Sequence, residues 1–174
     1  MTALLLAAPL LWWPTFHADS GRTGTSRVEF PSANFRLLWT FSLGEHVYRY
    51  EPGASVWSAS PAIGEVGGRA LVFVGAYDHN LYAIDARTGE MVWRCTAGEG
   101  IYAAPALAEV EGRLLVFFAS GDRTVYALDA GTGEPVWRRE VRPWSYTLVD
   151  CLPSSPLVAE VEAVSYTHLT LPTT

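Results

Sequence analysis

The chain has 174 residues, of which 49% are hydrophobic and 13% aromatic, a composition too apolar for an intrinsically disordered protein. Its 18 acidic residues and 12 basic ones, all arginine, give a formal charge of −6. This balance disfavours nucleic acid as a partner, because phosphate binding needs a basic face. No apolar run reaches the roughly 18 residues that a membrane-spanning helix needs.

Residues 3–13 form an apolar run of the length found in the core of a signal peptide. No Lys or Arg precedes this run, no small-x-small cleavage site follows it, and no lipid-accepting Cys lies near it. We interpret residues 1–11 as the remnant of an export signal that lacks its basic start. The alternative is a misassigned start followed directly by the mature domain. Export predicts a periplasmic or otherwise extracytoplasmic location.

An internal repeat dominates the middle of the chain. Segments 71–93 and 115–137 align without gaps at a spacing of 44 residues. The coinciding pairs are Asp78/Asp122, Tyr82/Tyr126, Asp85/Asp129, Gly89/Gly133 and Trp93/Trp137. A shorter element occurs three times, at 60–66, 104–110 and 155–161. A fixed period of this length is typical of repeat architectures.

Each period is predicted to form four short strands. In the first period these lie around 60–64 and at 70–75, 81–85 and 91–96, with turn residues at 67–68, 78–80 and 87–89. Short strands at about 8–12-residue spacing indicate an antiparallel meander, and one meander per ~40–45 residues is typical of a propeller blade. We therefore predict an all-β fold. It is a partial β-propeller of four-stranded antiparallel blades over residues 12–162, with two full blades plus flanking strands.

The turn between the third and fourth strands has a clear physical logic. The carboxylate of Asp85 can accept hydrogen bonds from backbone N–H groups of the turn, and Gly89 can adopt the positive φ that closes it. Trp93 then lies on the outer strand, where its ring can fill the wedge between blades. Asp129, Gly133 and Trp137 are the equivalents in the second period, and we interpret all six residues as structural.

The repeated pattern Ala-x-Asp-x-x-Thr-Gly-x-x-x-Trp, at 83–93 and 127–137, resembles the tryptophan-docking motif of the pyrroloquinoline-quinone (PQQ) repeat family. Residues 13–24 also resemble the start of the mature domain in that family. The resemblance implies a quinoprotein-like propeller of about seven or eight blades. It further implies that residues 37–41, with Trp39, form a leading outer strand that completes the last blade. We therefore expect the sequence to be a truncated fragment of such a propeller.

The C-terminal segment differs from everything before it. Residues 164–173 resemble one translated reading frame of a DNA-library sequencing adapter, and the repeat pattern breaks just before them, after Glu162. We interpret residues 163–174 as an artefact and expect them to be disordered. His168 therefore drops out as a candidate ligand.

Residues that could carry chemistry have simpler interpretations. Cys95 and Cys151 form no framework, and unpaired thiols are favoured over a disulfide. Asp78 and Asp122 could bind a cation, but Asp at such positions more often caps its own turn. The histidines lack metal-ligand spacing. We assign no catalytic, cofactor-binding or metal-binding residue.

Two insertions are the candidate binding loops. Residues 45–53 and 142–150 both join an outer strand to the next inner strand, so they should emerge on one face of the propeller. They carry the aromatic residues Tyr48, Tyr50, Trp144 and Tyr146. Aromatic side chains are enriched at binding hot spots, so these loops predict a protein or peptide partner. The alternative is that they are ordinary packing loops.

The resemblance leaves three functions open. The first is a non-catalytic extracytoplasmic scaffold, similar to the propeller lipoproteins of outer-membrane barrel assembly and needing no cofactor. The second is part of a PQQ-dependent alcohol or sugar dehydrogenase. Such enzymes hold PQQ and Ca²⁺ in the channel and often carry adjacent cysteines, whereas Cys95 and Cys151 are far apart in the sequence. The third is the sensor domain of a membrane kinase. The oligomeric state stays open.

Overall fold

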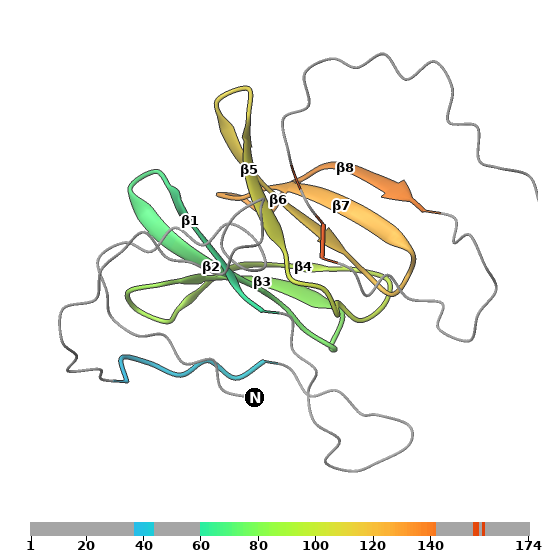
Figure 1. The fold of residues 1–174 in the computed structure, drawn as a ribbon. Helices are drawn as coiled ribbons and strands as arrows, with labels where there is room; N and C mark the ends of the chain where they lie inside the picture. The colour runs from blue at the N-terminus through green and yellow to red at the C-terminus, as the bar shows by residue number, and fades with distance from the viewer. Residues whose placement is uncertain (1–36, 44–59, 142–154, 157, 159–174) are drawn as a thin grey trace, which may run out of the picture.

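The computed structural model describes residues 37–43, 60–141, 155, 156 and 158 (Figure 1). In this part of the chain there are two four-stranded antiparallel sheets and no helix. The order of strands within each sheet follows the order along the chain. Each sheet is therefore an up-and-down meander, which confirms the predicted blades.

The first blade contains β1 (Ala62–Val66), β2 (Arg69–Gly75), β3 (Asn80–Asp85) and β4 (Met91–Thr96). The second contains β5 (Ala106–Val110), β6 (Arg113–Ala119), β7 (Thr124–Asp129) and β8 (Pro135–Glu140). The expected first strand, around 60–64, was placed about two residues early. Pro61 has no N–H to donate, so the ladder begins after it and continues to the Gly67-Gly68 turn.

A β-bulge determines which way the tryptophan of each blade points. Ala83 lies opposite Trp93, whereas Ile84 lies opposite Met91, so Val92 is the extra residue on β4. The second blade has the same irregularity, with Ala127 opposite Trp137 and Leu128 opposite Pro135. Without the extra residue the tryptophan would point to the other face of the sheet. With it, the Trp93 ring lies 5.8 Å from that of Phe73, and Trp137 lies 6.0 Å from Phe117.

Both faces of each sheet are apolar. One face of the first blade packs on the second blade, and this inter-blade core includes Phe73 and Leu81 on one side and Val116, Phe118 and Leu128 on the other. All five are buried. Alternating apolar side chains on both faces are what a sheet sandwiched between two neighbours requires. The blades are therefore joined through a single continuous core.

The leading segment, residues 37–43, covers the opposite face of the first blade. Trp39, Phe41 and Leu43 pack there on a cluster that contains Val72 and Ile84. Only Leu37 and Ser42 make isolated bridge pairings. The docking of Trp39 that was expected of an outer strand at 37–41 is present, whereas the strand's hydrogen-bonded pairing stays a prediction. A strand needs a neighbour along its edge, and within the described residues this segment has none over its length.

The third copy of the inner-strand element starts against the second blade. Val158 packs on a cluster of Leu115, Phe117 and Ala127. The N–H of Ala104 donates a hydrogen bond of 3.0 Å to the hydroxyl of Ser155. The face of the second blade that points away from the first is thus partly covered by this segment.

Several expectations fall on residues that the structure does not describe. These are the export remnant at 1–11, the tail at 163–174, Cys151, and the loop residues Tyr48, Tyr50, Trp144 and Tyr146. Across the described residues, no helix is long and apolar enough to cross a membrane.

The shared core predicts that the two blades unfold together. Replacing Phe118, which is fully buried, by Ala should lower the free energy of unfolding by about 3–5 kcal/mol, whereas Phe118→Leu should cost less than about 1.5 kcal/mol. Hydrogen exchange should speed up in β2 and β3 of the first blade as well as in β6 and β7. Faster exchange confined to the second blade would show that the blades are independent.

Candidate functional site

The residues of the repeated motif lie in two equivalent turns, after β3 and after β7. In the first, the N–H groups of Arg87 and Thr88 donate to Oδ1 of Asp85 at 2.9 and 3.1 Å. Gly89 closes the turn with a φ of +76° and donates its N–H to the Asp85 carbonyl at 2.9 Å. This φ lies in the left-handed region, which glycine adopts without a Cβ penalty.

The second turn repeats these bonds. The N–H groups of Gly131 and Thr132 donate to Oδ1 of Asp129 at 2.9 and 3.0 Å. Gly133 also has a φ of +76°. We call residues 85–89 and 129–133 the docking turns, because each receives a tryptophan from a neighbouring element.

An arginine from the start of β2 or β6 neutralises the aspartate of each docking turn. Arg69 donates to Oδ2 of Asp85 from Nη2 at 2.8 Å and from Nε at 3.1 Å. Arg113 donates from Nη2 to Oδ2 of Asp129 at 2.9 Å. These arginine hydrogen bonds, opposed by burial and aided by backbone N–H donors, lower the pKa of both carboxyls. Sequence reasoning missed both pairs, although each arginine directly follows a turn glycine.

The indole of the preceding element packs on each docking turn. The N–H of Trp39 donates to the carbonyl of Ala86 at 2.9 Å, and that of Trp93 donates to the carbonyl of Ala130 at 3.1 Å. A Cβ on Gly89 would lie 2.6 Å from the Trp39 ring, and one on Gly133 would lie 2.7 Å from the Trp93 ring. Glycine is thus required at these positions for space as well as for its positive φ.

Trp137 has different surroundings. Its ring contacts Phe117, but the residue is 44% exposed, and no carbonyl in the described part of the chain accepts its N–H. A docking turn on its far side is not among the described residues. Trp39 and Trp93 therefore make both the ring contact with a docking turn and the hydrogen bond from the indole N–H. Among the described residues, Trp137 makes neither of these two contacts.

Asp78 and Asp122 lie at the other end of the blades and cap their own turns. Asp78 accepts the N–H of Asn80 at 3.1 Å and the hydroxyl of Tyr82. Asp122 accepts the Thr124 N–H at 2.9 Å, the Tyr126 hydroxyl at 2.6 Å and the Gly98 N–H at 2.8 Å. The last bond ties the second blade to the connection between the blades.

These contacts change how the pair in the second blade titrates. Burial opposes ionisation of Asp122, but the hydrogen bonds from Tyr126, Gly98 and Thr124 outweigh it and lower the pKa of the carboxyl. Burial, together with the bond to Asp122, raises the pKa of Tyr126 to about 12. Both groups therefore hold their usual charge at neutral pH and serve to fix the turn.

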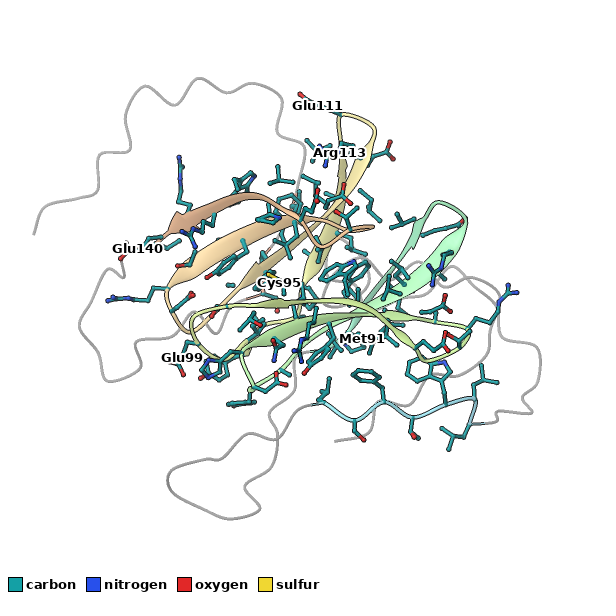
Figure 2. The ribbon with its side chains drawn as sticks, turned by 180° about the vertical axis from the view of Figure 1, so that it is seen from behind. Met91, Cys95, Glu99, Glu111, Arg113 and Glu140 are labelled. Atoms are coloured by element: carbon teal, nitrogen blue, oxygen red, sulfur yellow. The ribbon has the colours of Figure 1, made fainter. Side chains whose placement is uncertain are left out.

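The connection between β4 and β5 is held by hydrogen bonds at the end of the blades where Asp78 and Asp122 lie. The N–H of Ile101 donates to Ala76 at 3.0 Å, the N–H of Gly121 donates to Gly100 at 2.8 Å, and the hydroxyl of Ser120 donates to the Glu99 carbonyl at 2.8 Å. We call residues 76–80, 97–105 and 120–124 the loop face. Figure 2 shows Glu99, on the loop face, and Met91 at opposite ends of the first sheet.

The loop face presents polar side chains on a fixed backbone. The Glu99 side chain is 52% exposed, and its Oε1 lies 3.7 Å from Nε2 of His79. Tyr77 and Tyr102 pack edge to face with ring centroids 4.7 Å apart. Sequence reasoning missed this connection; the glycines on either side of Glu99 were the available signal. The loops with Tyr48, Tyr50, Trp144 and Tyr146 stay predictions.

Metal ligation finds little support in the described residues. No group of three or more His, Cys, Asp or Glu side chains among them could hold a metal ion. Cys95 is unpaired and half-buried, and burial raises the pKa of its thiol, so it is a poor nucleophile.

Comparison with known proteins identifies a family. The family model described as outer membrane protein assembly factor BamB matches residues 33–168. Among solved structures, the chain is similar to the quinohemoprotein alcohol dehydrogenase from Comamonas testosteroni. Identity is 26% and the TM-score is 0.53, over 77% of this chain and 20% of that one. No curated protein matches the sequence significantly.

Two further solved structures are similar at a lower level. A europium-containing methanol dehydrogenase is 23% identical with a TM-score of 0.40, over 60% of this chain and 19% of that chain. BamB from Moraxella catarrhalis is 17% identical with a TM-score of 0.33, over 72% of this chain and 48% of that one. The chain thus spans about a fifth of the length of the two dehydrogenases and about half of that BamB.

The unequal surroundings of the tryptophans predict unequal costs of truncation. Trp93→Ala should lower the free energy of unfolding by about 3 kcal/mol, because it removes a ring packed between blades and its hydrogen bond. Trp137→Ala should cost about 1 kcal/mol, since that residue is 44% exposed and its N–H has no acceptor among the described residues. Urea unfolding followed by circular dichroism measures both. Equal losses would contradict the docking of Trp93 on the second blade.

The lowered carboxyl pKa values predict a specific acid sensitivity. Asp85 and Asp129 have pKa values below the roughly 3.9 of an unfolded aspartate. Their contribution to stability is therefore present above about pH 4 and is lost as the pH falls through the folded values. The double variant Asp85→Asn/Asp129→Asn should melt at a lower temperature at pH 7. Its melting temperature should then change less between pH 5 and pH 3 than that of the parent chain. Parallel pH profiles would exclude these two carboxyls as the cause.

Proposed function

Because the chain belongs to the family of the outer membrane protein assembly factor BamB, we propose that it is a non-catalytic propeller scaffold that binds protein partners outside the cytoplasm. The observation that carries the proposal is the family match over residues 33–168, which includes both blades. The family description supports an outer-membrane protein, or another assembly factor, as the partner. It also supports a periplasmic location.

The engagement of the acidic side chains supports a structural role for them. Asp85 and Asp129 are held by arginine, and Asp122 is held by a tyrosine hydroxyl and two backbone N–H groups. A general acid or base needs a free site within hydrogen-bond reach of its substrate. These carboxylates accept hydrogen bonds from other groups of the fold. They are therefore better suited to stabilising the turns than to transferring protons.

The loop face supports partner binding. Its backbone is fixed by hydrogen bonds from both blades, and it presents the exposed side chain of Glu99 beside His79 and Tyr102. Loops positioned by a rigid scaffold are where binding residues concentrate. A preorganised surface also loses less conformational entropy when a partner docks.

A PQQ-dependent alcohol dehydrogenase is the second candidate. The similarity to the quinohemoprotein alcohol dehydrogenase from Comamonas testosteroni favours it. The described residues do not fit the Ca²⁺ that would accompany the quinone, because no three metal-ligating side chains converge among them. We therefore derive no catalytic step through PQQ. This candidate would draw its cofactor ligands from outside the described residues.

Photo-crosslinking in a Gram-negative bacterium that exports the protein tests the proposal. A photoreactive phenylalanine analogue at Glu99, on the loop face, should crosslink to an outer-membrane protein or an assembly factor. The same analogue at Glu90, an exposed residue at the docking-turn end of the first blade, should not. Crosslinks of equal yield from both positions would contradict a specific partner surface.

Addition of PQQ and Ca²⁺ to the purified protein separates the two candidates. The scaffold proposal predicts no change in melting temperature and no dye-linked alcohol oxidation. A rise in melting temperature that depends on both additions, together with alcohol oxidation, would favour the dehydrogenase.

A further inference from the structure

The connection between the blades is fixed over five consecutive residues, 97–101. The N–H groups of Ala97 and Ile101 donate to carbonyls of the first blade at 2.8 and 3.0 Å. Between them, Gly98, Glu99 and Gly100 each use a backbone group in a hydrogen bond of 2.8 Å to the second blade. Bonds to both blades therefore hold the backbone of Glu99 in one position.

Two glycines let this connection approach the second blade closely. A Cβ on Gly98 would lie 2.8 Å from Oδ2 of Asp122. A Cβ on Gly121 would lie 2.7 Å from Cγ of Glu99 and 2.9 Å from Cε2 of Tyr102. The side chains of Glu99 and Tyr102 therefore pack against the same point of the second blade and are neighbours.

The carboxylate of Glu99 retains hydrogen-bonding capacity at this fixed position. Its side chain is 52% exposed, and Oε1 lies 3.7 Å from Nε2 of His79, which is longer than a hydrogen bond. No other group in the described part of the chain donates to this carboxylate. Glu99 thus differs from Asp85, Asp122 and Asp129, which accept hydrogen bonds within the fold.

The loop face carries a negative charge. It contains three acidic residues, Asp78, Glu99 and Asp122, and one arginine, Arg123, so its net charge is −2 with His79 neutral. Hydrogen bonds lower the pKa of Asp122, so this carboxyl is ionised at neutral pH. A negative surface attracts and orients a positively charged group of a partner. The exposed Glu99 carboxylate is therefore suited to a cation.

The surroundings of Glu99 favour a guanidinium group over other cations. No three metal-ligating side chains converge among the described residues. A guanidinium group is planar, donates to both oxygens of a carboxylate and stacks on aromatic rings, whereas an ammonium group is compact and strongly hydrated. Tyr102 supplies an aromatic ring beside the carboxylate, and Tyr77 holds that ring edge to face at 4.7 Å.

We propose that Glu99 and Tyr102 form an anchor site for an arginine side chain of the partner protein. The guanidinium group pairs with the Glu99 carboxylate and packs against the Tyr102 ring. This inference deepens the proposed function and rests on it for the existence of a protein partner. It adds the chemistry that the partner must present, which is an exposed arginine in a positively charged segment.

An NMR titration of the full chain with the peptide acetyl-Gly-Arg-Gly-amide tests the site. The backbone amide resonances of residues 98–100 should shift to saturation, and Glu99→Gln should weaken binding at least fivefold. Glu111→Gln is the matched control, because Glu111 is an exposed residue at the tip of the β5–β6 hairpin, far from Glu99 in Figure 2. It should change the affinity less than twofold. Unchanged binding to the Glu99→Gln chain, or equal weakening by both variants, would overturn the proposal.

Matched peptides test the choice of arginine. The peptide with citrulline, which has the shape of arginine without its charge, should give no saturable shift. The peptide with lysine should bind at least threefold more weakly. A lysine or citrulline peptide that binds as tightly as the arginine peptide would overturn the proposal.

Two variants test the aromatic ring. Tyr102→Phe should keep the preference for arginine over lysine, because stacking needs the ring and not the hydroxyl. Tyr102→Leu should abolish that preference. A preference that survives in the Tyr102→Leu chain would exclude the ring from the site and overturn the proposal.

The titration and the crosslinking distinguish the anchor site from the proposed function. If the arginine peptide does not bind while Glu99 still crosslinks to an outer-membrane protein or an assembly factor, the anchor site is wrong and the scaffold function stands. If the peptide binds as expected while Glu99 crosslinks to no such protein, the arginine site is present and the scaffold function is wrong.

Discussion

The arrangement of the blades depends on one contact, in which an indole ring packs on the docking turn of the neighbouring sheet. The contact occurs twice, with Trp39 on the turn of the first blade and Trp93 on the turn of the second. It combines burial of a large ring, a hydrogen bond from the indole N–H to a backbone carbonyl, and a glycine whose missing side chain makes room for the ring. The ring burial, the hydrogen bond and the glycine each require the turn and the tryptophan to lie at a fixed position relative to one another.

The other features of the sheets follow from this contact. The β-bulge at Val92 turns Trp93 toward the second blade, and the one at Val136 does the same for Trp137 on the next face. Asp85 orders the turn that receives the ring, and Arg69 satisfies its remaining oxygen. The residues that define the repeat therefore hold neighbouring sheets together. This leaves the surface loops as the place for the protein partner that we propose from the family match.

The strands and their order could be predicted because the signals are local. Alternating apolar residues, turn glycines and a 44-residue period need no knowledge of neighbouring sheets. The features that sequence reasoning missed all depend on distant partners. Arg69 meets Asp85 only because the register of β2 and β3 brings together residues 16 apart, and the acceptor for Trp39 lies 47 residues away. The backbone pairing of residues 37–41 likewise depends on a neighbouring strand rather than on their own pattern.

A double-mutant cycle between Trp93 and Gly133 tests most directly whether the indole contact joins the blades. Gly133→Ala should destabilise the wild-type chain strongly, because its methyl group would lie 2.7 Å from the Trp93 ring and φ is positive. In the Trp93→Ala background the steric part of this cost should vanish and only the backbone strain should remain. The account predicts a coupling free energy of about 1–3 kcal/mol from urea unfolding of the four chains. Additive effects of the two substitutions would contradict it.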